Sequence, residues 1–321
     1  MKLATLKNGT PDGRLHLVSR DHERCAPAQT AATLQAALET WESAEASLRA
    51  EYDRLNADAG DRFDPREALA PLPRAWQWLD GSAFDSHGEL MQKVFGLPPV
   101  DTQGRPLMYQ GTSDRFYAPA ADVRLPSEDD GIDFEGEFGI VTDAVPMGLS
   151  AAEARGHIRL LVQINDWSLR KLAPVEMKTG FGWVQAKPAS SMAPVAVTPD
   201  ELGGHWRDCR VDLPLSVDWN GERFGAANGY AMSAGFDELV AHAAYSRDLV
   251  AGTVIGSGTV SNENYREVGS SCIAERRGIE MLDTGEPRTG FMRFGDRVRM
   301  QAALPDGTPL FGAIDQRVVE A

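Results

Sequence analysis

The segment from residue 133 to residue 141 most constrains both the fold and the chemistry of this chain. Its sequence, DFEGEFGIV, is typical of a β-strand, in which successive side chains point to opposite faces. Phe134 and Phe138 then face a core, whereas Glu135 and Glu137 share the other face. Two neighbouring carboxylates on one face repel each other unless water or a cation lies between them. A hard divalent cation prefers oxygen ligands, so these residues alone leave open a solvated strand face or a cation site.

The composition argues against several classes of partner. The chain has 321 residues, with 32 Lys and Arg against 47 Asp and Glu, and a net charge of −15. We expect neither a nucleic-acid nor a membrane partner, because both require a basic surface. Its three cysteines are far apart and form no CxxC pair, which fits a reducing compartment and argues against a zinc site of that type. No apolar run approaches the roughly 20 residues of a membrane span and no signal peptide is evident, so the sequence predicts a cytoplasmic protein.

The order of predicted elements indicates a mostly β, α+β protein. Residues 1–20 are typical of a β-hairpin, and a helix is predicted from Thr33, which can cap it, to about Asn56. Three prolines between residues 65 and 73 then interrupt the chain, so we place a boundary at residue 70. The predicted domains are a small N-terminal domain, residues 1–70, and a main domain, residues 71–321. The main domain shows no alternation of strands and helices, which argues against a doubly wound sheet.

Within the main domain the local patterns predict short elements. The expected helices cover residues 86–95 and 236–250, the expected strands cover residues 132–141, 160–164 and 211–219, and a further strand follows Gly269. Residues 98–112 are expected to form a loop, and the region 98–130 is our candidate for a segment that closes over the site. The glycine-rich stretch 256–259 lacks the spacing of a phosphate loop, so no nucleotide is expected.

Several charged residues stand where burial is expected. Asp166 follows the apolar strand 160–164, and a carboxylate there must be solvated, paired or bound to a metal, because an unpaired buried charge is costly. Arg170 is one candidate for its ion-pair partner. Lys187 lies among small and apolar residues and therefore requires an anionic neighbour. His87 begins the predicted helix 86–95, where a structural and a functional histidine are both compatible with the sequence.

Taken in order, these motifs resemble the fumarylacetoacetate hydrolase family over most of the chain. The residues that carry the resemblance are Asp80 with His87, Tyr109-Gln110-Gly111, Asp133 to Glu137, Asn165 to Arg170, Lys187, Gly256 to Thr259, and Gly269-Ser270 with Glu275. The resemblance implies a small N-terminal SH3-like α+β domain followed by a mixed β-sandwich roll. It also implies a homodimer.

The resemblance further implies a metal site and a set of catalytic residues. The implied ion is Mg²⁺ or Ca²⁺, with Mn²⁺ also possible, and the implied ligands are Asp80, Glu135, Glu137 and Asp166. His87 would be the general base, Glu275 its orienting carboxylate, and Lys187 a stabiliser of negative charge. Lining the substrate pocket would be Tyr109, Arg170 and Thr259.

The implied reaction is hydrolysis of a C–C bond in a 1,3-diketo acid of the fumarylacetoacetate or acylpyruvate type. His87 and Glu275 would activate water and the metal would stabilise the enolate. The substrate would be a small anionic keto acid from the breakdown of aromatic compounds. A 2-keto-4-enoate hydratase, a keto-acid decarboxylase and a non-enzymatic metal or small-acid binder remain alternatives.

The chain departs from the family pattern at three places. Ala173 replaces a glutamine of members that act on fumarylacetoacetate, and Gly96 replaces a substrate-binding arginine. The segment from Gly269 to Glu275 is two residues longer than the pattern. Since the first two differences concern the substrate pocket, the resemblance implies a reaction class rather than one substrate.

Overall fold

The computed structural model describes residues 1–96, 98 and 101–321, and its largest sheet has eleven strands. Ten of them follow the order β4-β3-β2-β1-β13-β10-β9-β18-β5-β6, and β12 pairs with β10 beside this path. The strands are β1 (Lys2–Leu6), β2 (Arg14–Val18), β3 (Arg24–Pro27), β4 (Asp61–Arg62), β5 (Gln77–Gly81), β6 (Met108–Gly111), β9 (Gly136–Thr142), β10 (Ile158–Asn165), β12 (Ser191–Met192), β13 (Val195–Val197) and β18 (Thr253–Gly256). Only β18 and β5 of this sheet's described pairs are parallel.

A second sheet packs against the first through the core. Its five strands follow the order β17 (Glu222–Asn228), β16 (Pro214–Trp219), β19 (Arg297–Ala303), β20 (Pro309–Glu320) and β7 (Val123–Leu125). The rings of Phe138 in β9 and Phe311 in β20 lie 6.0 Å apart. Gln163 of β10 bridges the two sheets, because its amide donates to the Met300 carbonyl at 3.0 Å and its oxygen accepts from the Ala302 N–H at 2.9 Å. This polar bridge satisfies buried backbone groups that would otherwise be left unpaired.

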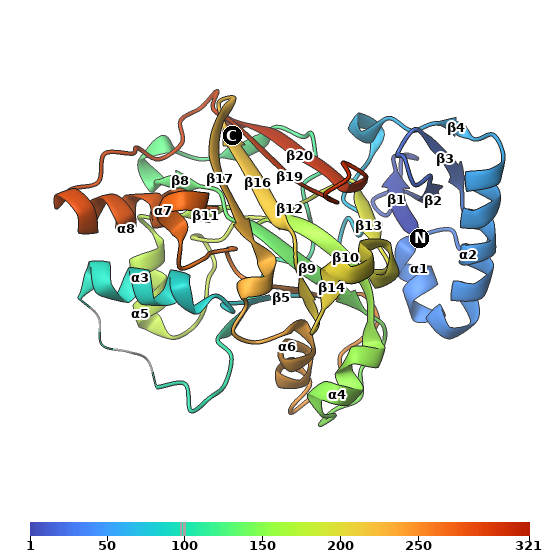
Figure 1. Cartoon of the computed structure of the whole chain (residues 1–321), viewed down its shortest axis with the longest axis horizontal. Coiled ribbons are helices and arrows are strands. Elements are labelled where there is room, and N and C mark those ends of the chain that lie inside the picture. Colours follow the sequence, from blue (N-terminus) through green and yellow to red (C-terminus); the bar gives the residue numbers. More distant parts are fainter. Residues whose placement is uncertain (97, 99–100) are drawn as a thin grey trace.

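Two shorter pairs and the helices complete the architecture. The pairs are β8 (Ile132–Asp133) with β11 (Ser168–Leu169), and β14 (Trp206–Arg207) with β15 (Arg210–Val211). The α-helices are α1 (Leu34–Glu39), α2 (Trp41–Ala57), α3 (Asp85–Phe95), α4 (Ala151–Ala154), α5 (Ala173–Thr179), α6 (Phe236–Ala243), α7 (Tyr265–Val268) and α8 (Ile273–Thr284). Short 3₁₀ turns cover Pro65–Glu67, Glu128–Asp130, Arg155–His157, Pro199–His205 and Gly229–Ala231. Helices α1 and α2 lie at one end of the molecule and α3, α5 and α8 at the other (Figure 1).

The N-terminal elements confirm the predicted hairpin, since β1 and β2 pair in antiparallel register. Thr33 caps α1 as expected, because its hydroxyl accepts a hydrogen bond from the Ala36 N–H. The single helix predicted to follow is wrong, because α1 ends at Glu39 and α2 begins at Trp41. The Thr40 hydroxyl donates to the Ala36 carbonyl at 3.0 Å, and such side-chain bonding competes with the helix backbone.

The mixed α+β class is confirmed, but several predicted elements differ. The strand expected over 132–141 is two strands, since the backbone N–H of Glu135 turns to the Asn165 side chain and Glu135 bridges to Cys272. The strand expected after Gly269 is the helix α8, whose N-cap is Cys272. The Asp133 carboxylate accepts from the N–H groups of Ile273 and Ala274, so a tertiary contact at the helix start overrides a short β-like run.

Two further differences arise because the segments form backbone hydrogen bonds with distant parts of the chain. The helix expected over 236–250 ends at Ala243, because Leu249 forms backbone hydrogen bonds with Val145 at 2.8 and 2.9 Å. The loop expected over 98–112 contains β6, which pairs with β5. The proposed closing segment 98–130 also contains β7, and its residues 99 and 100 lie outside the described residues.

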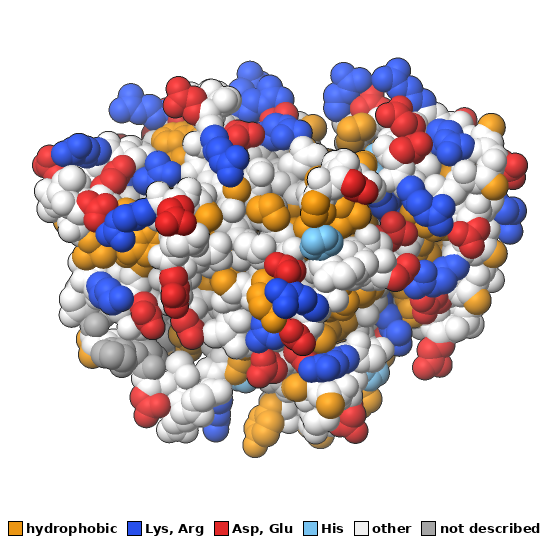
Figure 2. All heavy atoms as spheres, viewed as in Figure 1, with side chains coloured by type: hydrophobic (Ala, Val, Ile, Leu, Met, Phe, Trp, Pro, Cys, Tyr) orange, Lys and Arg blue, Asp and Glu red, His pale blue; other side chains and the backbone are white. Residues whose placement is uncertain are grey.

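The surface shows acidic and basic side chains interspersed over the face in Figure 2, with apolar side chains scattered between them. Among the described residues, no helix has both the length and the apolar character needed to cross a bilayer.

The close approach of Gly225 to Ser270 gives a stability prediction. A Cβ on Gly225 would lie 2.2 Å from the Ser270 carbonyl oxygen and 2.5 Å from its nitrogen. Because backbone cannot yield as a flexible side chain does, we expect Gly225→Ala to destabilise the protein by about 1–3 kcal/mol. Thermal unfolding followed by circular dichroism measures this. The exposed Gly156, whose Cβ would meet nothing within 4 Å, provides the control Gly156→Ala, and equal melting temperatures for both variants would contradict the expectation.

Candidate active site

Three buried carboxylates meet at one end of the large sheet. Asp80 is the penultimate residue of β5, Glu137 lies in β9, and Asp166 follows β10. One oxygen of each lies within 4.8 Å of the others. Their exposed fractions are 3%, 0% and 1%, respectively. The solvated strand face considered from the sequence is therefore wrong for Glu137.

The strand between Asp80 and Glu137 makes room for both carboxylates. In β18, Gly256 lies opposite Asp80 on one side and Gly139 of β9 on the other. A Cβ on Gly256 would lie 2.5 Å from an Asp80 oxygen and 2.9 Å from a Glu137 oxygen. The glycine therefore leaves the space in which the two carboxylates approach each other.

This carboxylate group fits a hard divalent cation. Within the described residues, neither oxygen of Glu137 has a hydrogen-bond partner. Burial, together with the charge of Asp166, raises the pKa of Asp80 to about 8. Burial and the neighbouring carboxylates Asp80 and Asp166 also raise the pKa of Glu137 well above its ordinary value. An all-oxygen set of mutually repelling groups with unpartnered oxygens suits Mg²⁺, Mn²⁺ or Ca²⁺.

Glu135, the fourth predicted metal ligand, is held by donors and cations instead. One oxygen accepts from Ser168 Oγ at 2.6 Å and Lys187 Nζ at 2.7 Å, and the other accepts from Thr259 Oγ1. Arg170 Nη2 lies 2.8 Å from the first oxygen. Although burial opposes ionisation, Arg170 and Lys187 hold the pKa of Glu135 below its usual range. Its role as a metal ligand stays a prediction.

Lys187 lies between two carboxylates, which are the anions expected beside it. Its Nζ donates to Asp166 Oδ2 at 2.5 Å as well as to Glu135. Burial disfavours the ammonium, but Asp166 and Glu135 outweigh this and raise the pKa of Lys187 above its ordinary value. Lys187 is therefore a fixed positive charge. It is also the ion-pair partner of Asp166, so the suggestion that Arg170 fills that role is wrong.

His87 and Glu275 form a pair although 188 residues separate them. His87 lies in the first turn of α3 and Glu275 in the first turn of α8. His87 Nδ1 lies 2.9 Å from Glu275 Oε2, and the side chains are 19% and 0% exposed. Because a carboxylate accepts the Nδ1 proton, the neutral ring presents Nε2 as a proton acceptor. The extra length of the segment 269–275 does not prevent this contact.

Arg170 is anchored by a residue that was given no role in the sequence analysis. Its Nε donates to Asp133 Oδ2 at 2.8 Å. The buried Asp133 carboxylate also accepts from the N–H groups of Ile273 and Ala274, at 2.7 and 2.9 Å. Asp133 thereby ties Arg170 to the start of α8, the helix that carries Glu275. The sequence signal that could have identified Asp133 is its place in the alternating acidic positions 133, 135 and 137.

The other predicted pocket residues touch the carboxylates directly. Tyr109 donates from its hydroxyl to Asp166 Oδ2 at 2.6 Å, and Thr259 donates to Glu135. The ring of Trp183 packs edge-on against Tyr109 at 5.9 Å. Ser190, which donates to Asp166 Oδ1 at 2.6 Å, carried no sequence signal, because isolated serines are common.

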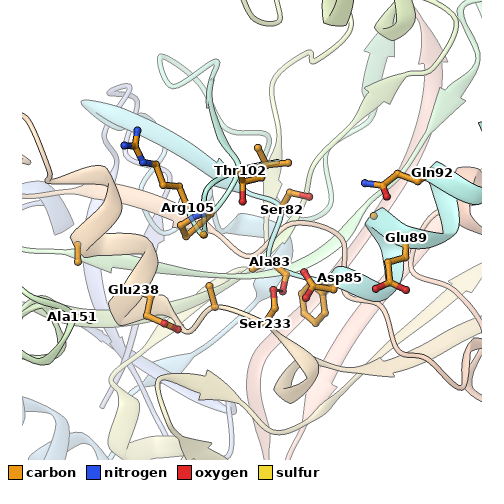
Figure 3. Close-up of a pocket in the computed structure, with 17 residues that line it drawn as sticks. Ser82, Ala83, Asp85, Glu89, Gln92, Thr102, Arg105, Ala151, Ser233 and Glu238 are labelled. Carbon is orange, nitrogen blue, oxygen red and sulfur yellow. Dashed lines mark hydrogen bonds between the residues drawn. The ribbon is translucent and has the colours of Figure 1, made fainter. Parts of the chain in front are cut away.

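Two cavities lie near these residues. One, of about 680 Å³, opens between the start of α3, residues 102–107 and α6 (Figure 3). Asp85 and Gly88 flank His87 and line it, but no predicted site residue does. The other, of about 440 Å³, is bordered by Arg170 and Ala274 and by apolar side chains that include Met91, Met177 and Phe291. Arg170 therefore borders a cavity that is lined mainly by apolar side chains.

Family models match nearly the whole chain. The model of the fumarylacetoacetate hydrolase C-terminal domain matches residues 77–319, and that of the fumarylacetoacetase N-terminal domain 2 matches residues 1–74. The chain belongs to the fumarylacetoacetate hydrolase family. The fold implied by the resemblance is therefore confirmed.

Several family relatives are similar to this chain. A 2,4-didehydro-3-deoxy-L-rhamnonate hydrolase of Sphingomonas sp. (strain SKA58) is 27% identical over 212 residues, which is 62% of this chain and 70% of that protein. The structure of maleylpyruvate hydrolase from Sphingobium sp. SYK-6 covers all of both chains with a TM-score of 0.67 at 16% identity. A second structure of that enzyme contains manganese (II) ion and pyruvate, with full coverage of both chains, a TM-score of 0.66 and 15% identity. A 5-carboxymethyl-2-hydroxymuconate delta-isomerase from Mycobacterium smegmatis gives a TM-score of 0.62 at 18% identity, over 100% of this chain and 99% of that one. At these identities the structures show a shared fold.

The raised pKa of Asp80 predicts that metal binding releases protons. At neutral pH the metal-free carboxyl, with a pKa of about 8, is mostly protonated, and a ligand must lose that proton. Mn²⁺ affinity should therefore rise as the pH increases through about 8. Titration calorimetry in two buffers of different ionisation enthalpy measures the protons released per ion. Asp80→Asn is the control, and it should bind weakly and release fewer protons.

The raised pKa of Asp80 also makes the stability of the metal-free protein depend on pH. The folded pKa exceeds the unfolded value of about 3.9, so this group favours folding at low pH and its contribution disappears as the pH rises through about 8. Mn²⁺ should accordingly raise the melting temperature more at about pH 9 than at about pH 6. An equal shift at both values, with no proton release, would contradict a site built on Asp80.

Proposed function

We propose that this protein is a divalent-metal-dependent hydrolase that cleaves a C–C bond in a 1,3-diketo acid of the acylpyruvate or fumarylacetoacetate type. The observation that carries the proposal is the pairing of His87 with the buried Glu275. The base His87 and the carboxylate of Asp80 come from one short segment, residues 80–87, whereas Glu137 and Asp166 come from β9 and from the end of β10. The metal would be held by Asp80, Glu137 and Asp166, with Glu135 as a fourth ligand.

His87 begins the reaction by taking a proton from water through Nε2. Glu275 keeps the ring oriented and stabilises the imidazolium that forms. The hydroxide adds to a carbonyl carbon of the substrate, and the bond from that carbon to the methylene between the two carbonyl groups then breaks. The electron pair remains on the methylene carbon, which finally receives a proton. The products are two acids, which together contain the atoms of the substrate and one water.

Lys187 and Arg170 supply the positive charge that this sequence of steps requires. Lys187 is a permanent ammonium held by Asp166 and Glu135, so it stabilises negative charge as it develops on the substrate. Arg170, bordering the apolar cavity, would bind the substrate's carboxylate while apolar atoms enter the cavity. A bound divalent cation would add Lewis-acid polarisation of the substrate's carbonyl groups.

A rearrangement without cleavage is the second candidate, because relatives of the same fold include a delta-isomerase. A hydratase of 2-keto-4-enoates and a keto-acid decarboxylase would use the same residues. Hydrolysis is favoured because the His87 and Glu275 pair is arranged to deprotonate water. We also propose a homodimer acting in the breakdown of aromatic compounds in the cytoplasm, with domains 1–70 and 71–321, on the basis of the family resemblance.

The test is an absorbance assay on a panel of acids with EDTA-stripped protein, with and without added Mg²⁺ or Mn²⁺. The panel contains maleylpyruvate, fumarylpyruvate, fumarylacetoacetate and the 2,4-didehydro-3-deoxy acid named for the Sphingomonas relative. Metal-dependent loss of the enol band, with two acids recovered by chromatography, supports hydrolysis. A single product of unchanged composition would mean isomerisation, and loss of CO₂ would mean decarboxylation.

Removal of the base should abolish turnover while leaving the metal site intact. We expect His87→Ala to lower kcat by about 10²–10⁴-fold without changing Mn²⁺ affinity measured by calorimetry. Glu275→Gln should lower kcat as well, because the amide cannot stabilise the imidazolium charge. His205, whose Nδ1 donates to the backbone carbonyl of Asp212 at 3.1 Å, gives the matched control His205→Ala. Undiminished turnover in His87→Ala would reject this mechanism.

A further inference from the structure

We infer that His87, Cys272 and Glu275 form a second metal site, selective for a borderline-soft ion such as Zn²⁺, whose occupation silences the base. One ligand atom of each residue lies within 4.8 Å of the others. The set offers one nitrogen, one sulfur and one oxygen. Zinc is commonly bound by such mixed ligands, whereas Mg²⁺ and Ca²⁺ prefer oxygen alone.

Glu275 provides an independent sign that a ligand belongs here. Its side chain is fully buried, and its Oε1 has no hydrogen-bond partner among the described residues. A buried carboxylate oxygen without a partner is costly. A bound cation would satisfy this oxygen.

Cys272 is buried, and this burial together with the nearby Asp133 and Glu275 raises the pKa of its thiol well above the ordinary value, so its thiolate would form only as a cation binds. Cys272 is the N-cap of α8, a helix of 12 residues, and its Sγ accepts from the Glu275 N–H at 3.3 Å. Negative charge is favoured at a helix N-terminus. A thiolate and a carboxylate together balance the charge of a divalent ion, and a neutral imidazole completes a three-ligand set.

The two sites of this protein would therefore differ in the ions that they select. The group Asp80, Glu137 and Asp166 offers only oxygen, whereas His87, Cys272 and Glu275 include sulfur and nitrogen. Zinc–ligand distances of about 2.0–2.3 Å require the three atoms to draw closer, and the partly exposed His87 is the side chain that can rotate to do so. With His87 bound to a metal, water activation is lost, so Zn²⁺ would inhibit an enzyme that Mg²⁺ or Mn²⁺ activates.

Cobalt spectroscopy tests this site without turnover, so its result is independent of the proposed reaction. Co²⁺ bound to a thiolate gives a sulfur-to-metal charge-transfer band in the near ultraviolet. We expect this band when Co²⁺ is added to Mn²⁺-saturated wild-type protein, and we expect its loss in Cys272→Ser. Cys25 and Cys209 are also buried and unbridged, so Cys25→Ser and Cys209→Ser are matched controls that should keep the band. Absence of the band in wild type, or its persistence in Cys272→Ser, overturns the inference.

Inhibition gives the second readout. Each variant is compared with its own activity without Zn²⁺, with Mg²⁺ or Mn²⁺ saturating. Loss of a ligand should weaken Zn²⁺ inhibition at least as much as loss of an outer-shell contact, about 10–100-fold. The control variants Cys25→Ser and Cys209→Ser should be inhibited as the wild type is. Equal inhibition of Cys272→Ser and wild type would place the inhibitory Zn²⁺ at the oxygen-only group and overturn the inference.

Discussion

Mutual repulsion among buried carboxylates is the constraint on which this structure depends. Among the described residues, six carboxylates are buried in one region, and the cations Lys187 and Arg170 contact three of them, Asp133, Glu135 and Asp166. The six are Asp80, Asp133, Glu135, Glu137, Asp166 and Glu275. Burial of unbalanced charge is costly, so the region requires protons or a cation. Asp80 and Glu137 show this requirement directly, because their pKa values are raised.

The two protein cations divide the carboxylates into groups with different tasks. Arg170 and Lys187 share Glu135, and each also holds one aspartate, Asp133 or Asp166. Within the part of the chain that the structure describes, Glu137 has no cation partner, and it lies beside Asp80. Arg170 and Lys187 thus lie beside Asp133, Glu135 and Asp166. The pair Asp80 and Glu137 is left for a metal ion. Gly256 leaves the room in which Asp80 and Glu137 approach each other.

Packing of α3 against α8 connects the base to this arrangement. The position of Gly278 in α8 would bring a Cβ to within 3.3 Å of Val94 in α3, so the two helices lie close. The same helix pair carries His87 and Glu275, and Asp133 fixes the start of α8 from the sheet side. Movement of α8 would therefore disturb the base, Arg170 and Cys272 together.

The sequence by itself determined the features that depend on local periodicity and short motifs. These include the α+β class, the N-terminal hairpin, the cap at Thr33 and, through the family motifs, the residues that converge at the site. Only the tertiary structure decided which charges pair, that Glu275 lies on a helix, and that Cys272 lies beside His87. The physical reason is distance along the chain. His87 and Glu275 are 188 residues apart, and Asp133 and Ile273 are 140 residues apart. Hydrophobic periodicity and turn motifs predict structure only over a short window of sequence, so they cannot predict contacts between such distant residues.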